Sequence, residues 1–216
     1  MSRHAILFDM DGVVVDSMRF HAAAWKQVLN EYGLRVNDID IYLREGMSGR
    51  QSVEDIFFQY GRKFPDEGVF QDLIAKKHAL FESNRIVLFP GIEAILDLVR
   101  GRNIMTGLVT GSLKRSVRHL LEPGVLSRFD VVVTAEDVSK GKPDPEPYAT
   151  AMESLGAKPE LALIIENAPM GIRSAKSAGA TCYALETTLP ARYLKEADKI
   201  VKDHRSLLDL LRSGFS

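Results

Sequence analysis

Two aspartates one residue apart mark the end of an apolar run near the start of the chain. Residues 6–14 read ILFDMDGVV. Because alternate side chains of a β-strand point to the same side, Asp9 and Asp11 can both face one site as the strand ends. Two close carboxylates repel each other, which favours either a bound divalent cation such as Mg²⁺ or a raised pKa for one of them. A plain turn at Gly12 fits the same letters, so this motif alone leaves both interpretations open.

Two further polar clusters follow apolar runs later in the chain. Thr110, Gly111 and Ser112 come directly after the apolar run 104–109 and before a helical pattern. A hydroxyl beside the free N–H groups of a helix start can bind an anion. Lys142 lies in GKPDP, a stiff loop that would present its ammonium group. Taken singly, these residues could equally be helix caps and a surface lysine.

The fourth cluster is Glu166 with Asn167, at the carboxyl end of the run LALII over 161–165. This run is typical of a buried strand. Glu166 alone could be a solvated strand end. Four polar clusters that each end an apolar run are much harder to attribute to chance, and together they predict one site.

The elements that must position these clusters alternate between strand and helix. This alternation predicts an α/β fold, with a Rossmann-like parallel sheet and helices on both faces. Ligands of such sheets bind beyond the carboxyl ends of the strands, where all four clusters lie. The predicted strands cover 4–9, 104–109, 130–133, 161–165 and 181–184, and the predicted helices cover 91–100, 112–121, 145–155 and 169–178.

Residues 15–85 break the alternation. Ala24, Trp25, Val28, Leu29 and Tyr32 fall at helical spacing, and two more helical stretches cover roughly 49–60 and 67–82. We therefore predict an α/β core domain made of 1–14 and 86–216, with a helical domain over 15–85 inserted into it.

The composition limits the class of protein. The 216 residues are 45% hydrophobic, enough for one large domain or one domain with an insert. The net charge is −1 and the basic residues are scattered, so we expect no nucleic-acid partner. No apolar stretch approaches the ~20 residues that span a bilayer, and we identify no signal peptide. We expect a cytoplasmic monomer without a membrane partner, in which the single cysteine, Cys182, is a buried, inert thiol.

The four clusters together resemble the motifs of the haloacid dehalogenase-like phosphotransferases. Within that superfamily they resemble the branch of β-phosphoglucomutase and related sugar-phosphate phosphatases. The matched elements run from residue 9 to residue 179 and are highly specific for the superfamily but poorly specific for the substrate. They are DMDGV at 9–13, TGS at 110–112, Lys142, ENAPMG at 166–171 and AG at 178–179.

The resemblance implies a catalytic role for four residues. Asp9 would be the nucleophile that forms an aspartyl-phosphate. The side chain of Asp11 would act as general acid to the leaving group and then as general base. Thr110, the N–H groups of Gly111 and Ser112 that follow it, and Lys142 would hold the phosphoryl oxygens.

The resemblance also implies a Mg²⁺ cofactor, which would offset the repulsion between Asp9 and a phosphate. Its ligands would be Asp9, the backbone carbonyl of Asp11, Glu166 and Asn167. This branch usually has aspartate at the position of Asn167. An amide oxygen can bind Mg²⁺ but carries no formal charge, so we expect weaker metal binding.

The inserted helices correspond to the mobile cap of the family. Its hinges would lie near 14–17 and 84–90. On one cap helix His21 and Trp25 lie four residues apart, so His21 could either contact substrate or pack against Trp25. Arg50, in a glycine-containing loop, could grip the distal part of a phosphorylated substrate or be a solvated residue at a helix start.

These observations favour a Mg²⁺-dependent phosphatase that acts on a small phosphorylated metabolite such as a sugar phosphate. Dehalogenases of the superfamily lack the acid and metal ligands that Asp11 and Glu166 represent here. The alternative is a β-phosphoglucomutase-like mutase, whose pattern has a lysine where Arg44 or Glu45 falls in this chain. A third hypothesis, motivated by Asn167, is a binding module that has lost catalysis.

Overall fold

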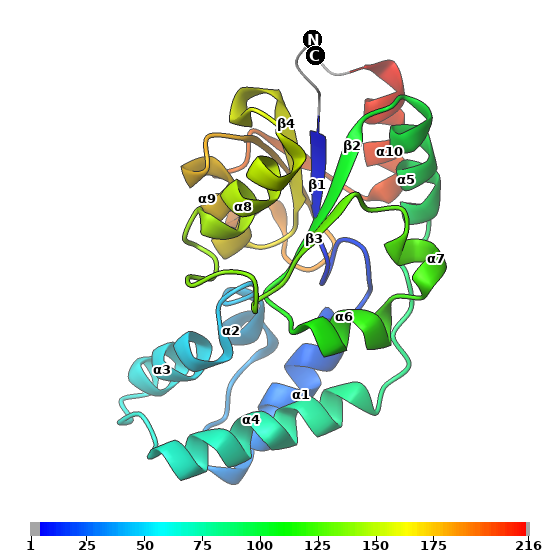
Figure 1. The fold of residues 1–216 in the computed structure, drawn as a ribbon. Coiled ribbons are helices and arrows are strands. Elements are labelled where there is room, and N and C mark those ends of the chain that lie inside the picture. Colours follow the sequence, from blue (N-terminus) through cyan, green and yellow to red (C-terminus); the bar gives the residue numbers. More distant parts are fainter. Residues whose placement is uncertain (1–4, 215–216) are drawn as a thin grey trace.

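The computed structural model describes residues 5–214. Six parallel strands form one sheet in the order β3-β2-β1-β4-β5-β6 (Figure 1). In the register of the sheet, Leu7 of β1 lies opposite Gly107 of β2 on one side and Ile164 of β4 on the other. The strand that carries Asp9 is therefore central and completely buried. The strands are β1 Ala5–Asp9, β2 Met105–Val109, β3 Val131–Val133, β4 Ala162–Glu166, β5 Thr181–Leu185 and β6 Lys199–Val201.

Side chains of the central strand alternate between two hydrophobic cores. Ile6 and Phe8 pack with apolar residues of α5 and α10. Leu7 packs on the opposite face with residues of α8 and α9. Figure 1 shows these two helix pairs on the two sides of the sheet, which confirms the predicted α/β fold. The bounds are α5 Ile92–Gly101, α8 Glu146–Leu155, α9 Pro169–Ser177 and α10 His204–Ser213.

Four helices inserted after β1 form a cap with its own hydrophobic core, below the sheet in Figure 1. Trp25, Val28, Ile56 and Leu73 are among the buried side chains of this core. The capping box of Ser48 and the third residue after it fixes the start of α3. The bounds are α1 Met18–Glu31, α2 Asp38–Tyr42, α3 Gly49–Gln59 and α4 Glu67–Glu82.

The two chain segments that join cap and core lie side by side. Val15 and Leu88 form an isolated antiparallel bridge. The N–H of Asp16 donates to the carbonyl of Val87 at 2.9 Å, and the N–H of Phe89 donates to the carbonyl of Val14 at 3.0 Å. Both predicted hinges fall on these paired segments, and the exact domain bounds stay a prediction.

The structure adds the strand β6, the helix α10 and several short helices, α2 among them, that the sequence analysis did not predict. The strand β6 has only three residues and begins with the exposed Lys199, so it shows no apolar alternation. The helix α10 follows it directly. The first residue of the predicted strand 4–9 lies outside the described part of the chain. The ends of the predicted core domain, residues 1–4 and 215–216, also lie outside it. The predicted helix 112–121 corresponds to α6 Lys114–Leu120. The other short helices are α7 Pro123–Leu126, η1 Pro159–Leu161 and η2 Ala191–Tyr193.

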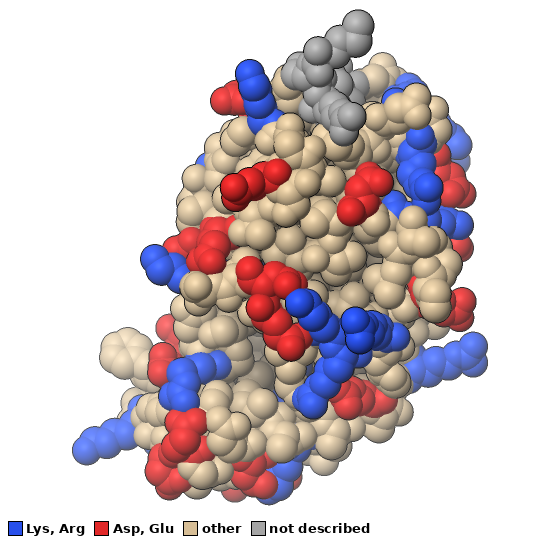
Figure 2. Space-filling model, viewed as in Figure 1, with Lys and Arg blue, Asp and Glu red and all other residues tan. Residues whose placement is uncertain are grey.

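Charged side chains of both signs are interspersed over the face shown in Figure 2, in keeping with the net charge of −1. Cys182 on β5 is buried and free, as predicted, and burial raises the pKa of its thiol well above the ordinary value. Among the described residues no helix has the length and apolar character needed to cross a membrane.

Candidate active site

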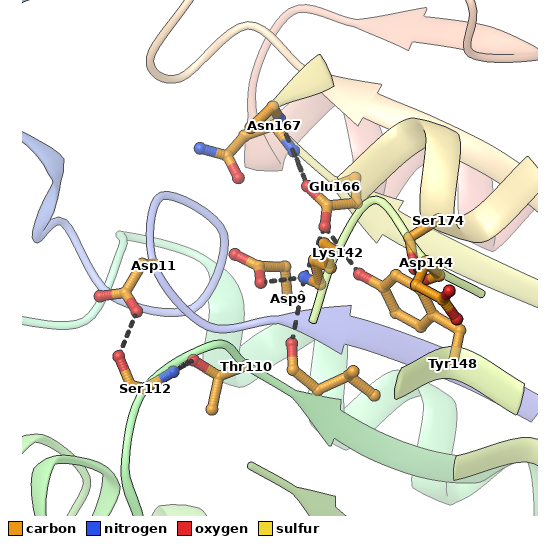
Figure 3. Close-up of polar contacts among 12 residues, drawn as sticks. Asp9, Asp11, Thr110, Ser112, Lys142, Asp144, Tyr148, Glu166, Asn167 and Ser174 are labelled. Atoms are coloured by element: carbon orange, nitrogen blue, oxygen red, sulfur yellow. Dashed lines mark hydrogen bonds and ion pairs between the residues drawn. The ribbon is translucent and has the colours of Figure 1, made fainter. Parts of the chain in front are cut away.

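The predicted clusters converge at the carboxyl end of the sheet (Figure 3). Asp9 and Glu166 are the last residues of the adjacent strands β1 and β4, and Thr110 follows β2. Lys142 reaches them from the loop before α8. All four side chains are buried, so the charges of Asp9, Glu166 and Lys142 interact with little screening by solvent.

Lys142 joins the two strand-end carboxylates. Its Nζ lies 2.5 Å from Oδ1 of Asp9 and 2.7 Å from Oε1 of Glu166, and 3.4 Å from the carbonyl oxygen of Val109. Burial alone would lower the pKa of Lys142, but Asp9 and Glu166 raise it above its ordinary value. The ammonium group therefore stays charged and holds one oxygen of Asp9 in place.

Glu166 has hydrogen-bond donors on both oxygens. Its Oε1 also accepts from the hydroxyl of Tyr148 at 2.7 Å. Its Oε2 accepts from the backbone N–H groups of Asn167 at 2.9 Å and Ala168 at 3.3 Å. Burial and the charge of Glu166 raise the pKa of Tyr148 well above its ordinary value, so the phenol remains a donor. The sequence analysis missed Tyr148, because an aromatic residue on a helix is most simply part of a core.

Asp9 and Asn167 each keep one oxygen free. The buried Oδ2 of Asp9 and the buried Oδ1 of Asn167 have no hydrogen-bond partner among the described residues. The Nδ2 of Asn167 donates to Thr188 at 2.9 Å, which leaves its oxygen directed toward the Asp9 carboxylate (Figure 3). Burial raises the pKa of Asp9 to about 8 despite Lys142, and the charges of Glu166 and Asp11 add to the rise.

These two orphaned oxygens fit a hard cation. A carboxylate and an amide oxygen are ligands that Mg²⁺ accepts, and a cation there would also offset the rise in the pKa of Asp9. Within residues 5–214, no group of three or more His, Cys, Asp and Glu side chains is arranged to hold a metal ion. Glu166 is already occupied by its donors, and the side chain of Asp11 is turned elsewhere. The metal roles of Asp11 and Glu166 therefore stay predictions.

Asp11 accepts hydrogen bonds from both cap and core. Ser17 Oγ donates to its Oδ1 at 2.5 Å, His21 Nε2 lies 3.1 Å from the same oxygen, and Ser112 Oγ donates to Oδ2 at 3.2 Å. Burial pushes the pKa of Asp11 up, but His21 and Ser17 outweigh it and bring that pKa to about 2. Asp11 is therefore ionised at neutral pH in this state.

His21 connects Asp11 to a buried lysine of the cap. Its Nδ1 lies 3.0 Å from Nζ of Lys77. Because burial and Lys77 lower the pKa of His21, the ring is neutral, accepts at Nδ1 and donates from Nε2 to Asp11. The ring stacks on Phe81 at 3.9 Å between centroids, rather than on Trp25. Contact with substrate stays a prediction, although His21 does line the cavity described next.

A cavity of about 320 Å³ separates cap and core. His21, Arg50 and the core residues Gly111 and Ser112 line it, together with apolar cap residues such as Trp25. A smaller cavity of about 80 Å³ next to it reaches Thr110 and Lys142. The cap loop at Gly46 lies against Gly111, where an added Cβ would meet the Gly46 carbonyl at 3.1 Å.

Two of the predicted binding groups are engaged within the protein. The N–H of Ser112 donates to Oγ1 of Thr110 at 3.0 Å. Arg50 pairs with Glu67 at 2.5 Å, and its guanidinium lies 4.5 Å from the centroid of the Phe70 ring. Its predicted contact with substrate is untested.

Comparison with known proteins agrees with this arrangement. A family model described as haloacid dehalogenase-like hydrolase matches residues 6–185. A validoxylamine A 7′-phosphate phosphatase of Streptomyces hygroscopicus is 33% identical over 91% of this chain and 92% of its own length. The β-phosphoglucomutase of Bacillus subtilis is 29% identical over 98% of this chain and 95% of its own. The crystal structure of a β-phosphoglucomutase from Clostridium difficile superposes with a TM-score of 0.84 at 25% identity, covering 98% of this chain and 96% of that one.

Proposed function

Because the chain belongs to the haloacid dehalogenase-like hydrolases, we propose that it is a Mg²⁺-dependent phosphatase of a small phosphorylated metabolite, most simply a sugar phosphate. The observation that carries this proposal is the state of Asp9. One of its oxygens is fixed by Lys142, while the other is buried without a partner at the end of the central strand. A carboxylate held in this way is suited to attack a phosphorus atom.

In the proposed first step, Oδ2 of Asp9 forms a bond to phosphorus and the ester bond between phosphorus and the leaving oxygen breaks. Lys142 keeps the attacking carboxylate oriented and balances part of its charge. A Mg²⁺ ion beside the Asp9 carboxylate, held by the free oxygen of Asn167, would neutralise charge on the phosphoryl group. The small cavity lined by Thr110 and Lys142 would bring the phosphoryl oxygens next to these two residues.

Asp11 carries the proton transfers of the proposal. Asp11 is ionised in the free protein, and its carboxylate would take a proton from the attacking water in the second step. The water oxygen then binds phosphorus, the aspartyl-phosphate bond breaks, and Asp9 is released as a carboxylate. To protonate the leaving oxygen in the first step, Asp11 must gain a proton, and the negative charge of an entering phosphate favours this by raising its pKa.

A phosphosugar mutase is the second candidate. The likeness to proteins named β-phosphoglucomutase over nearly the whole chain favours it. The two candidates differ in whether water or a sugar accepts the phosphoryl group from Asp9.

The test is a panel of phosphorylated metabolites assayed with Mg²⁺ for free phosphate and for isomerised product. We expect phosphate release by the wild type and none by Asp9→Asn, because an amide is a very poor nucleophile. Circular dichroism should show an unchanged fold in the variant. Substantial turnover by pure Asp9→Asn would refute the assignment of the nucleophile, and isomerised product without free phosphate would favour the mutase.

A further inference from the structure

Asn167 presents an amide at a position where a carboxylate is usual, and the two groups differ in symmetry. Either oxygen of a carboxylate can bind a cation, so its rotation by half a turn changes nothing. An amide binds a cation only through its oxygen, because the hydrogens of its NH2 group are donors and repel the ion. The side chain of Asn167, which is fully buried, must therefore hold one orientation to act as a ligand of Mg²⁺.

Thr188 is the partner of the other half of this amide. The Nδ2 of Asn167 donates to Oγ1 of Thr188 at 2.9 Å, while its Oδ1 is buried without a partner among residues 5–214. In Figure 3 this oxygen is directed toward Asp9. Thr188 lies in the loop after β5, and β5 pairs with β4, which ends directly before Asn167.

Gly12 encloses the same NH2 group from the side of the Asp9–Asp11 loop. A Cβ at Gly12 would lie 2.0 Å from Nδ2 of Asn167 and 2.9 Å from Oγ1 of Thr188, so this close approach requires a glycine. The hydroxyl of the neighbouring Thr187 donates to the carbonyl of Gly12 at 2.6 Å. The loop after β5 is thus tied to the loop that carries Asp11, and Thr188 supplies the acceptor for the enclosed NH2 group.

The hydroxyl of Thr188 removes the cost of the orientation that a cation requires. A hydroxyl can donate or accept, so it satisfies the amide in either orientation. Without this hydroxyl, an oxygen directed toward Asp9 would leave the enclosed NH2 group without an acceptor, which costs free energy. The reverse orientation would turn the NH2 group toward the unpartnered Oδ2 of Asp9 and would then be favoured. In that orientation Asn167 offers no oxygen to a metal ion.

We infer that Thr188 is a positioning residue of the metal site, which keeps the oxygen of Asn167 available to Mg²⁺. The inference rests on the proposed Mg²⁺-dependent function. Groups that orient a metal ligand from behind commonly change metal affinity by roughly 10- to 100-fold. Together Asn167 and Thr188 let the site bind Mg²⁺ without the usual carboxylate, so the amide does not mark a site that has lost its metal.

The test is Mg²⁺ binding to the metal-free protein, measured as Kd by isothermal titration calorimetry and as the rise in Tm on adding Mg²⁺. Valine has the shape of threonine without its hydroxyl, so Thr188→Val should raise the Kd for Mg²⁺ by about 10-fold. Thr188→Ser keeps the hydroxyl and should bind Mg²⁺ as the wild type does. Thr181→Val, at the exposed start of β5, is the matched control and should leave the Kd unchanged.

A second background separates the orientation of the amide from a general effect on the loop. In Asn167→Asp either carboxylate oxygen can face the ion, so adding Thr188→Val should not raise the Kd for Mg²⁺. Equal Kd values for the wild type and Thr188→Val would overturn the inference. An equal rise of the Kd in both backgrounds would overturn it as well, because Thr188 would then act on the loop and not on the amide.

Unfolding curves without Mg²⁺ show whether each variant folds. If Thr188→Val does not fold, the comparison of Thr188→Ala with Thr188→Ser makes the same test. Mg²⁺ binding that depends on Thr188, without phosphate release from any monoester, would refute the phosphatase and leave the inference standing. Phosphate release by a protein whose Kd for Mg²⁺ does not depend on Thr188 would refute the inference alone.

Discussion

Replacing Gly171 by alanine tests the ion-pair network from a position that carries no functional group. Gly171 lies in the first turn of α9, directly beneath the carboxylate of Glu166. A Cβ at this position would lie 1.7 Å from Oε1 and 2.0 Å from Cδ of Glu166. Side chains that end in solvent can move away from such a contact at little cost. Glu166 cannot, because it is buried and four donors hold it.

The magnitude follows from what Glu166 would lose. Alanine is worth at most ~1 kcal/mol over glycine in a helix interior. Separating a buried carboxylate from its partner costs about 3–5 kcal/mol, and here the partners are Lys142 at 2.7 Å and Tyr148 at 2.7 Å. We expect Gly171→Ala to be destabilised by a net ~2–4 kcal/mol, which for a chain of this size lowers Tm by roughly 5–15 °C. Because Lys142 would lose one of its two anchors, kcat should also fall.

The measurement is thermal and urea unfolding, combined with a phosphatase assay. Gly124→Ala is the control, since Gly124 also lies in a helix and an added Cβ there meets nothing within 4 Å. It should be neutral or slightly stabilising. Shortening the acid in Gly171→Ala with Glu166→Asp should recover part of the lost stability. A Gly171→Ala protein that melts at or above the wild type and keeps its kcat would refute the reasoning.

Three further predictions concern the metal, the substrate and the pH. Asn167→Asp should need less Mg²⁺ for half-maximal activity and gain more Tm on adding Mg²⁺, because it adds a charge where a free oxygen now lies; coincident Mg²⁺ titrations would exclude Asn167 as a ligand. Arg50→Ala should lower kcat/KM for the true substrate by a factor that corresponds to ~1–3 kcal/mol of transition-state stabilisation, while kcat/KM for a small aryl phosphate changes little. Equal losses of kcat/KM on both substrates would point to a purely structural role of Arg50. Burial, with Lys77 and Arg115, lowers the pKa of His78 from 6.5 to about 4. The stability that neutral His78 provides is therefore present above pH 6.5 and lost as the pH falls toward 4, so the Tm difference between wild type and His78→Gln should shrink over that range; a constant difference would contradict this.

The location of the candidate site was easier to predict from the sequence than the contacts between its side chains. Strand periodicity places Asp9 and Glu166 at one edge of a parallel sheet, and the structure has them on adjacent strands. The partners of Glu166 were not predictable in the same way. Lys142 and Tyr148 reach it from a loop and a helix, whose paths depend on packing against the sheet and not on local pattern.

The cap loop illustrates the same limit. Arg50 was expected to be either a substrate contact or a solvated residue, and the structure pairs it with Glu67 across two helices. His21 was expected to reach substrate or to pack on Trp25, and its ring contacts Phe81, Lys77 and Asp11 instead. Each contact joins residues far apart in the chain, so spacing within one helix could not reveal it.

The insertion of the cap separates the two strands that pair at the centre of the sheet. Ala5 pairs with Met105, so this contact closes a very long loop, and such non-local contacts slow folding. The paired segments around Val15 and Leu88 join the ends of the inserted helices. A chain in which these segments have already met carries the helices as a closed side loop, and β1 and β2 then have only short stretches left to bring together. The same pairing that holds the cap over Asp9 therefore reduces the entropy that the sheet loses when it forms.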